Sequence, residues 1–411
     1  MKIFECGHEI KGSIRVPGDI LLSHMALMLA SVKDGRTLIK NINMNEEVSV
    51  TASILAKLGV RIDYSEDTRE AAVTGCPEMA FNDPGQVLDC GESVYTFKLL
   101  CGLLCGQRFS SVIKCDRLIK RQRIDLLLSQ LQGCGANIVS ENADNYPPVV
   151  IKPSVLKSFE LPKSRRDILD DASAAITCIY SGMNVPDGLP FKLKSLLSSF
   201  GNDVITIPAD FSLAAPFIAI SCIKDGSSLT LENVLADKKA SAFIEILKEM
   251  GADITVSDKI SGSALPSFDL FIRQAPLFSK EVSSVNIDEL KDNILSLVLI
   301  MTAAAGRSVI NGLAALSLSE YERLERFCEA LRLMKGKTKL SDFSLSVKGG
   351  HKMTGYALRT YGDPYLLMAL SAAALVSNGS SITDAGPREN SVYPGFFDDI
   401  IKLTGSGCFK E

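Results

Sequence analysis

The sequence predicts an α/β protein of two domains, and three observations lead to that prediction. The chain has 411 residues, more than the roughly 250 to 300 residues at which a single hydrophobic core stops growing. A turn followed by a long apolar stretch recurs along the chain, which indicates one structural unit used several times. The residues before the turn alternate as in a strand, and the apolar stretch after it suits a buried helix.

The first two copies of the repeat match position by position. Val16-Pro17-Gly18-Asp19 opens an apolar stretch that ends at Lys33-Asp34-Gly35. Ile207-Pro208-Ala209-Asp210, 191 residues later, opens a second stretch that ends at Lys224-Asp225-Gly226. A third and weaker copy begins at Tyr361-Gly362-Asp363-Pro364. The copies lie in both halves of the chain, so the repeat agrees with two related domains.

Each element of the first copy follows from the local sequence. Ser13–Val16 alternates as a strand, and Pro-Gly-Asp interrupts it before a predicted helix over Leu21–Val32. Gly35 ends that helix because glycine readily adopts the left-handed conformation of a helix cap. Thr37–Ile39 is a short predicted strand, and Glu47–Leu58 is a second, amphipathic helix.

Further stretches bring the predicted number of units to six. The second copy has its own strand at Leu229–Leu231 and its own outer helix at Ala240–Met250. In every unit an acidic residue precedes an apolar helix, where it can accept a backbone N–H and favour the positive end of the helix dipole. Six helix N-termini that point the same way suit an anion, so we expect a phosphorylated or carboxylate ligand. Three less complete units follow the same pattern. One begins at Val87–Cys90, before a helix that ends at Gly106. The others begin at Ile168–Asp171, before a helix over Ala172–Tyr180, and at Asn286–Glu289, before a helix over Ile294–Ala305.

Composition excludes several classes of function. Hydrophobic residues make up 46% of the chain and charged residues 22%, which allows a large core. The 44 basic and 48 acidic residues give a net charge of -4, which provides no electrostatic surface for nucleic acid or an anionic membrane. The first residues lack the apolar stretch of a signal peptide, so we expect a cytoplasmic location.

The eleven cysteines are scattered along the chain and are accompanied by only three histidines. A chain with a core of this size needs no disulfides, so we expect reduced and buried thiols. Cys101 and Cys105 are the closest pair, and a spacing of four places them on one face of a helix. We expect no metal site.

The turn at Gly12–Asp19, followed by Ser23, His24 and Ala26, resembles the opening of the EPSP synthases, the 3-phosphoshikimate 1-carboxyvinyltransferases of the shikimate pathway. The resemblance continues in order and at matching spacing over essentially the whole chain. The chain is therefore identified as a member of that family. The other matching motifs are Leu88–Gly91, Leu99–Leu104, Ile287–Leu290, Ser319–Arg323, Tyr361–Asp363 and Tyr393–Phe396.

The resemblance implies a two-domain inside-out α/β barrel with three repeated units in each domain. One domain would be discontinuous, residues 1–18 with 238–411, and the other would be residues 19–237. Enzymes of the family transfer the enolpyruvyl group of phosphoenolpyruvate to the 5-hydroxyl of 3-phosphoshikimate in a cleft between the domains, and release phosphate. No metal or organic cofactor is implied, and we expect a monomer that binds a small anionic ligand.

The family reaction needs cations, because two phosphates and two carboxylates enter one water-poor site. Several positions of this chain depart from the family pattern where those cations are expected. A lysine, a serine and an arginine of the first family motif fall on Ile20, Leu21 and Met25. The family's Ser-Ser-Gln, which holds the shikimate phosphate, falls on 168–170, and the arginine of its Asp-His-Arg motif falls on Tyr365. The other departures are Glu92, Val94, Tyr95, Gln122, Ser319 and Ser391.

Three retained residues are candidates for catalysis by the same resemblance. Asp288 would contact the acceptor hydroxyl and serve in proton transfer, Glu320 would act as acid or base on the enolpyruvyl methylene, and Arg323 would bind the carboxylate of phosphoenolpyruvate. Two carboxylates can do acid and base work where their surroundings set their pKa values apart. The candidate substrate-binding residues besides Arg323 are Ser23 of the first motif and the basic residues Lys98, Arg121, Arg123 and Arg388.

Three functions agree with this pattern. The chain is a binding or regulatory protein that has lost phosphoshikimate chemistry, an enolpyruvyl transferase for a less anionic acceptor, or an EPSP synthase with relocated basic residues. Apolar walls at Ile20, Leu21, Met25 and Tyr365 predict an apolar or neutral ligand, or none. Relocated arginines around the site would favour the third function.

Overall fold

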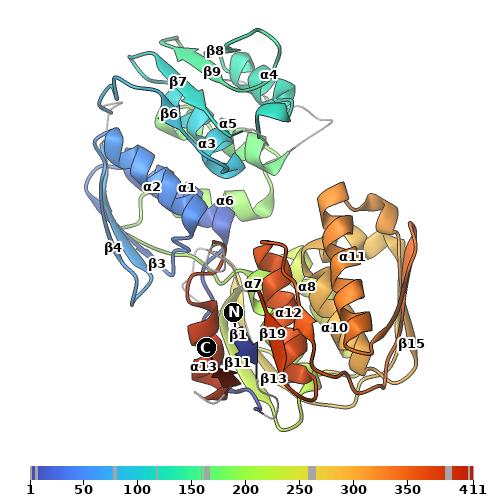
Figure 1. Cartoon of the computed structure of the whole chain (residues 1–411). Helices are drawn as coiled ribbons and strands as arrows, with labels where there is room; N and C mark the ends of the chain where they lie inside the picture. The colour runs from blue at the N-terminus through green and yellow to red at the C-terminus, as the bar shows by residue number, and fades with distance from the viewer. Residues whose placement is uncertain are drawn as a thin grey trace. The chain divides into compact units, whose positions relative to one another are not determined.

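The computed structural model describes residues 2–4, 8–76, 81–116, 119–158, 160–161, 167–257, 265–384, 391–405 and 408–410. Over these residues the strands form five four-stranded sheets, with helices between them along the chain (Figure 1). Each of the five sheets contains one parallel pair of strands, and its other pairs are antiparallel. The α/β prediction is confirmed. All five sheets share one pattern of strand pairing, as expected for a repeated structural unit.

The chain forms two compact units. Unit 1 is Met1–Pro17 together with Pro208–Glu411, and unit 2 is Gly18–Ile207. From the sequence we expected the chain to cross between domains after residues 18 and 237. The second boundary between the units, after Ile207, therefore lies earlier in the chain than the expected crossing after residue 237.

Strand pairing explains why the stretch from Pro208 onward lies with unit 1. The strand β11 (Ser228–Leu235) pairs in parallel with β2 (Lys11–Ile14) and antiparallel with β13 (Ser267–Arg273). The helix α7 (Phe211–Ile223) packs on both β11 and β13. These elements share one core, so the backbone leaves unit 2 before α7 begins.

Unit 2 is built on three buried helices. Every side chain from Ile20 to Ser31 of the first of them is buried, as its uninterrupted apolar sequence predicts. The elements are α1 (Ile20–Val32), β3 (Arg36–Lys40), α2 (Glu46–Lys57), β4 (Arg61–Ser65), β5 (Glu70–Thr74), β6 (Leu88–Asp89), α3 (Val94–Leu104), β7 (Ser111–Lys114), η1 (Ile119–Arg121), α4 (Asp125–Gly133), β8 (Asn137–Ser140), β9 (Val149–Lys152), α5 (Ile168–Tyr180), α6 (Phe191–Leu197) and β10 (Val204–Thr206). The sheets have the orders β10-β3-β5-β4 and β6-β7-β9-β8.

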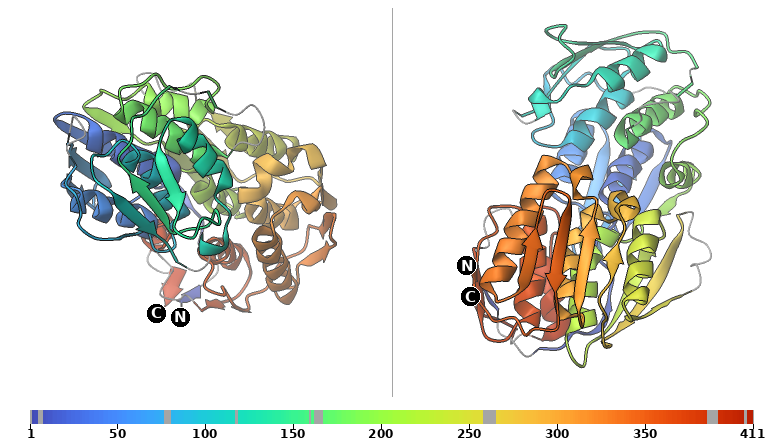
Figure 2. Two further views of the ribbon diagram at one scale, coloured as in Figure 1. Left: turned by 90° about the horizontal axis from the view of Figure 1, so that it is seen from above. Right: turned by 90° about the vertical axis from the view of Figure 1, so that its right-hand side faces the viewer.

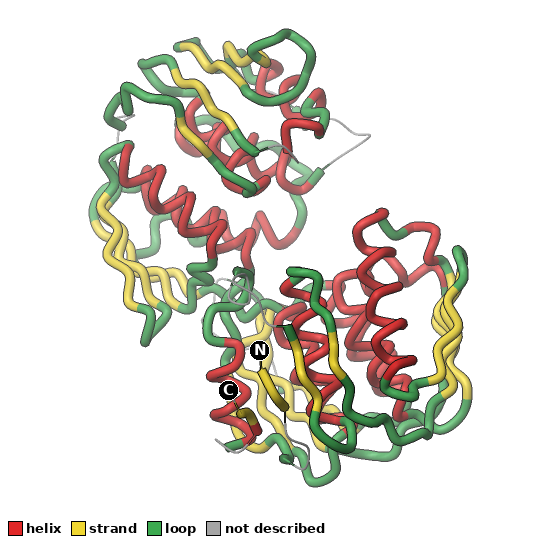
Figure 3. Tube along the Cα trace, viewed as in Figure 1, coloured by secondary structure: helices red, strands yellow, loops and turns green. Residues whose placement is uncertain are grey.

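Unit 1 has three sheets around α7, α10 and α12, which pack against one another (Figures 1 and 2). Its remaining elements are β1 (Lys2–Phe4), α8 (Lys238–Glu249), β12 (Asp253–Val256), β14 (Glu281–Val282), η2 (Ser284–Asn286), α9 (Ile287–Leu290), η3 (Lys291–Asn293), α10 (Ile294–Ala303), β15 (Arg307–Asn311), η4 (Leu313–Ala315), α11 (Leu318–Leu333), β16 (Lys337–Leu340), β17 (Ser344–Lys348), β18 (Ala357–Leu358), α12 (Pro364–Val376), β19 (Ser381–Thr383), α13 (Phe396–Thr404) and β20 (Phe409–Lys410). The three central helices lie between strands of these sheets in Figure 3. Among the described helices none is long and apolar enough to cross a membrane.

The repeated turns share a capping aspartate and one backbone hydrogen bond in the two strongest copies. Asp19 accepts the N–H of Leu22 at the start of α1, and Asp210 accepts the N–H of Ser212 at the start of α7. The residue before each aspartate donates its N–H to a left-handed asparagine, Asn41 in one copy and Asn233 in the other, at 3.1 and 2.8 Å. The predicted aspartate caps are confirmed at these two turns.

The capping residues of the other units agree with the prediction only in part. Asp363 caps α12 as expected. Ser93 rather than Asp89 caps α3, and Asp89 instead pairs with Lys114 at 2.8 Å. The cap of α5 is Asp167, so that helix begins at Ile168 rather than at residue 172 as predicted. For α10 there is no side-chain cap, because η3 leads directly into the helix.

Candidate functional site

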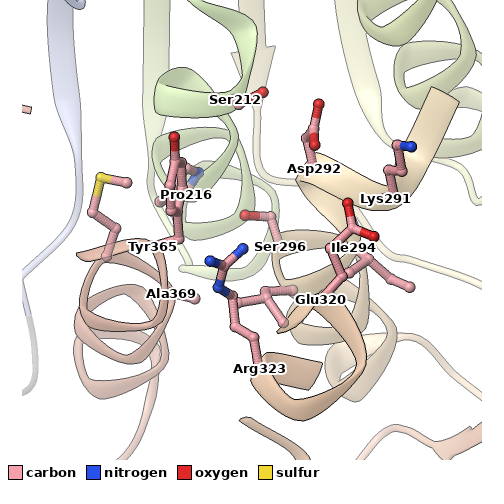
Figure 4. Close-up of a pocket in the computed structure, with 12 residues that line it drawn as sticks. Ser212, Pro216, Lys291, Asp292, Ile294, Ser296, Glu320, Arg323, Tyr365 and Ala369 are labelled. Carbon is pink, nitrogen blue, oxygen red and sulfur yellow. The ribbon is translucent and has the colours of Figure 1, made fainter. Parts of the chain in front are cut away.

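A pocket in unit 1 lies where the N-terminal turns of α7, α10, α11 and α12 meet (Figure 4). Three of these helices are the buried helices of the unit, so N-terminal helix ends do gather at one place here, as the repeat predicts. Their backbone N–H groups and dipoles favour a negatively charged ligand. The pocket is lined by Ser212, Pro216, Lys291, Asp292, Ile294, Leu295, Ser296, Glu320, Arg323, Tyr365, Met368 and Ala369.

Arg323 is held in this pocket by two contacts with the start of α12. Its Nε donates to Oδ2 of Asp363 at 2.6 Å, and its guanidinium carbon lies 4.9 Å from the centre of the Tyr365 ring. The other oxygen of Asp363 accepts the N–H groups of Tyr365 and Leu366. In Figure 4 the guanidinium points into the pocket. Asp363 thus orients Arg323 and balances part of its charge.

Glu320 lines the same pocket from the first turn of α11. It forms a capping box with Ser317: its Oε2 accepts the Ser317 N–H at 2.7 Å, and its own N–H donates to the Ser317 hydroxyl. One carboxylate oxygen is therefore fixed by the helix end. The capping box holds the side chain of Glu320 on the pocket side of α11.

Asp292 is a pocket residue that the sequence analysis missed. It lies in η3, two residues before α10, and forms an ion pair with Lys239 of α8. Burial acts to lower the pKa of Lys239, but Asp292, Asp210 and Asp237 together outweigh that effect and the pKa is raised. Lys239 therefore stays protonated and keeps a positive charge beside Asp292.

Asp288, the aspartate that the sequence suggested, is not among the residues that line this pocket. It lies on the short helix α9, its side chain is 74% exposed, and the nearest recorded cation is Lys291 at 4.0 Å. Asp292, which lines the pocket, is two residues from the start of α10, whereas Asp288 is six residues away.

Lys98 is the most enclosed of the candidate cations in unit 2. It lies on α3, and its Nζ is 2.8 Å from Oδ1 of Asp170 and 3.2 Å from Oδ1 of Asp167. Burial raises the pKa of Asp170, and the charge of Lys98 acts in the opposite direction. Lys98 is thus neutralised by carboxylates of this chain.

Comparison with known proteins decides the family. A family model described as EPSP synthase (3-phosphoshikimate 1-carboxyvinyltransferase) matches residues 4–165 and 198–400. The chain belongs to the EPSP synthase family. The 3-phosphoshikimate 1-carboxyvinyltransferase of Thermodesulfovibrio yellowstonii is 28% identical and covers 98% of this chain and 99% of its own length. That of Bacillus licheniformis is 27% identical, over 96% of this chain and 97% of its own.

Two solved structures show the same fold. The EPSP synthase from Acinetobacter baumannii superimposes with a TM-score of 0.87 at 22% identity, over 98% of each chain. The enolpyruvyl transferase NikO from Streptomyces tendae superimposes with a TM-score of 0.67 at 15% identity, over 98% of this chain and 97% of its own. At these identities the likeness concerns the fold alone.

The three positions of the first motif at which a lysine, a serine and an arginine were expected carry apolar side chains here. Ile20, Leu21 and Met25 are all buried. A cation does reach this turn from another element: Lys192 of α6 forms an ion pair with Asp19. The sequence analysis missed Lys192 because it lies far from Asp19 along the chain.

The other candidate binding residues are spread out. Ser23 is fully buried, and its hydroxyl donates to the Asp19 carbonyl and accepts the N–H of Asn43. Arg121 and Arg123 are exposed, and Arg123 lies 3.3 Å from Asp125. Arg388 lies outside the described residues.

His24 of the first motif belongs to the core of unit 2. Its Nδ1 lies 2.8 Å from the Thr51 hydroxyl, its ring stacks on Tyr95 at 5.2 Å, and burial lowers its pKa to about 3. In the unfolded chain the pKa is about 6.5. The unfolded state therefore binds a proton that the folded state rejects between these two pH values.

We expect the stability of the protein to decrease as the pH falls from 6.5 toward 3, by about 1.4 kcal/mol for each pH unit from His24 alone. Urea unfolding at several pH values measures this slope. His24→Gln should flatten the slope, whereas the same change at the exposed His351 should not. An unchanged slope in His24→Gln would mean that His24 is not the acid-sensitive group.

Proposed function

We propose that this member of the EPSP synthase family is an enolpyruvyl transferase that uses phosphoenolpyruvate and an acceptor less anionic than 3-phosphoshikimate. The single observation that carries the proposal is the meeting of Asp292, Glu320 and Arg323 at one pocket. A scaffold that had lost all chemistry would not need these three groups side by side. The neutralised lysines of unit 2 support the change of acceptor.

The three residues have separate roles in the proposed reaction. Arg323 binds the carboxylate of phosphoenolpyruvate and exchanges part of its bond with Asp363 for the ligand. Asp292 accepts the proton of the acceptor hydroxyl while the acceptor oxygen bonds to C2 of phosphoenolpyruvate. Glu320 passes a proton to the methylene carbon as the new bond to C2 forms. Glu320 then takes back a proton from the resulting methyl group while phosphate leaves C2, which restores the double bond and gives the enol ether product.

The finer expectations from the sequence remain proposals. They are the six-unit barrel with three units in each domain, a monomeric state and a cytoplasmic location. The domain boundaries after residues 18 and 237 also remain a proposal. The compact units divide instead after Pro17 and Ile207. The parallel and antiparallel pairing shared by five sheets supports the repeated unit.

Phosphate release tests the proposed function. The purified protein is incubated with phosphoenolpyruvate and either shikimate or 3-phosphoshikimate, and the thermal shift with each ligand is measured in parallel. We expect phosphoenolpyruvate to raise the melting temperature, and phosphate release to be faster with shikimate. Faster release with 3-phosphoshikimate would instead support a working EPSP synthase. No release and no shift with phosphoenolpyruvate would support a protein without this chemistry.

A further inference from the structure

Unit 2 contains a pocket of its own at the C-terminal ends of α3 and α5. The hydroxyl of Ser173 donates to the carbonyl of Lys98 at 2.7 Å, and the hydroxyl of Thr177 donates to the carbonyl of Gly102 at 2.9 Å. Both pairs are 75 residues apart, so the two helices lie side by side and run in the same direction. The residues just after the two helices therefore meet, and they form one side of the pocket.

The other side of the pocket is the stretch 153–156, which follows β9. The N–H of Asn137 donates to the hydroxyl of Ser154 at 3.2 Å, and the N–H of Lys157 donates to the carbonyl of Cys134 at 2.8 Å. These bonds hold the stretch against the end of α4 and the start of β8. The pocket has a volume of about 440 Å³, which is within the usual range of small-molecule sites.

Gln107 lines this pocket with an amide that makes no hydrogen bond. The residue is only 2% exposed, and neither Oε1 nor Nε2 has a partner among the described residues. Burial raises the pKa of the neighbouring Tyr180 to about 12, and the nearby Gln107 amide acts in the opposite direction. The two groups nevertheless make no hydrogen bond with each other. Buried amides are nearly always hydrogen-bonded, so a free donor and a free acceptor at a pocket suit a bound ligand.

Two further groups at the pocket suit a carboxylate. The buried hydroxyl oxygen of Ser181 has no hydrogen-bond partner among the described residues. Arg108 is exposed, and it is the one charged residue among the described residues that line the pocket. A guanidinium presents paired N–H donors that match the two oxygens of a carboxylate. A ligand carboxylate would therefore meet donors and no opposing charge.

The acceptors at the pocket suit a positively charged group beside that carboxylate. Oε1 of Gln107 can only accept a hydrogen bond, and α3 and α5 both direct the negative end of their dipole toward this place. An ammonium group can donate to Oε1 and is stabilised by both helix ends. Apolar contacts are offered by Val155, Leu156 and Met183, of which Val155 is 92% exposed.

We propose that this pocket is a binding site for an α-amino acid with an apolar side chain. Arg108 and Ser181 bind its carboxylate, Oε1 of Gln107 accepts from its ammonium group, and the three apolar residues contact its side chain. The site is independent of the proposed function, because all of its groups belong to unit 2 and the pocket described above belongs to unit 1.

Calorimetry with the unmodified chain tests the class of ligand. L-leucine is compared with 4-methylpentanoate, which lacks the ammonium group, and with leucinamide, which lacks the carboxylate. We expect L-leucine to bind and each analogue to bind about ten-fold more weakly, the effect of losing one hydrogen-bonded charge. The proposal is wrong if an analogue binds as tightly as L-leucine, or if neither L-leucine nor the larger L-phenylalanine binds.

Gln107→Leu removes the amide and keeps a side chain of similar size. We expect binding of L-leucine to weaken about ten-fold, and the melting temperature of the free protein not to fall, because the amide has no hydrogen bond to lose. Gln132→Leu is the matched control, since Nε2 of Gln132 donates to the carbonyl of Ile138 at 2.8 Å. It should lose stability and keep its affinity. A lower melting temperature with unchanged affinity in Gln107→Leu would show a structural role and overturn the proposal.

Arg108→Gln provides a second test, because the exposed side chain of Arg108 is not needed for packing. We expect binding of L-leucine to weaken about ten-fold and binding of leucinamide to change little. Arg61→Gln is the control: it removes another exposed arginine of unit 2, 3.1 Å from Asp63, and should change neither affinity. Equal losses in both arginine variants, or none in Arg108→Gln, would contradict the proposal. None of these measurements needs turnover, so a failure to release phosphate would count against the proposed function alone.

Discussion

Asp292→Asn is expected to lower the rate of phosphate release from phosphoenolpyruvate by about 10² to 10⁴-fold, the usual contribution of a general acid or base. The amide cannot accept a proton from the acceptor hydroxyl, although it can occupy the same space. Because Arg323 is unchanged, the thermal shift caused by phosphoenolpyruvate should persist. Initial rates and melting curves of the purified variant check both expectations.

Asp288→Asn is the companion variant, since it makes the same chemical change four residues earlier at an exposed side chain of α9. We expect a much smaller effect on the rate. A larger loss of rate in Asp288→Asn would instead assign the proton transfer to Asp288, the residue that the family motif suggested. Asp292→Asn also removes the partner of Lys239, so the melting temperatures of the two variants must be compared first.

Gly102→Ala is expected to cause a large loss of stability in unit 2. A Cβ at this position would lie 2.1 Å from the carbonyl oxygen of Ser173 and 2.6 Å from its hydroxyl. Helices α3 and α5 would have to move apart, which would weaken the bonds from Ser173 and Thr177 to α3. Forced overpacking of this kind costs about 1 to 3 kcal/mol and sometimes more. Urea unfolding measures the change.

Gly35→Ala separates the effect of crowding from the effect of losing a glycine. Its φ is +85°, but a Cβ there meets no atom within 4 Å. We expect a loss of about 1 kcal/mol from the left-handed backbone alone. A loss as large as that of Gly102→Ala would show that the contact between α3 and α5 is not the cause.

Local sequence was a sound guide to the elements and to the family. The apolar stretch after Asp19 predicted α1 within one residue at its start, because burial on all sides leaves an uninterrupted apolar sequence. The same signal was less useful at α10. There the one-turn helix α9 and η3 come between the acidic motif and the long helix, and the nearer aspartate, Asp292, was missed.

The carboxylate partners of the basic residues in the two units could not be predicted from the sequence. Lys98 with Asp170, Lys192 with Asp19 and Arg323 with Asp363 each join residues from different helices, 40 to 173 positions apart. No local pattern reports such pairs. The sequence shows which cations have been lost at the family positions, and the fold shows that Lys98, Lys192 and Arg323 have carboxylate partners.

Unit 2 is one continuous stretch whose two ends lie at the same place. The N–H of Gly18 donates to the carbonyl of Asn41, and the N–H of Ile207 donates to the carbonyl of Lys40. Closing a flexible loop of about 190 residues would cost on the order of 4 to 5 kcal/mol of chain entropy. If unit 2 folds first, it brings Pro17 and Pro208 together, and most of that cost is met before unit 1 assembles. The order of folding along this chain is therefore expected to run from the inserted segment outward.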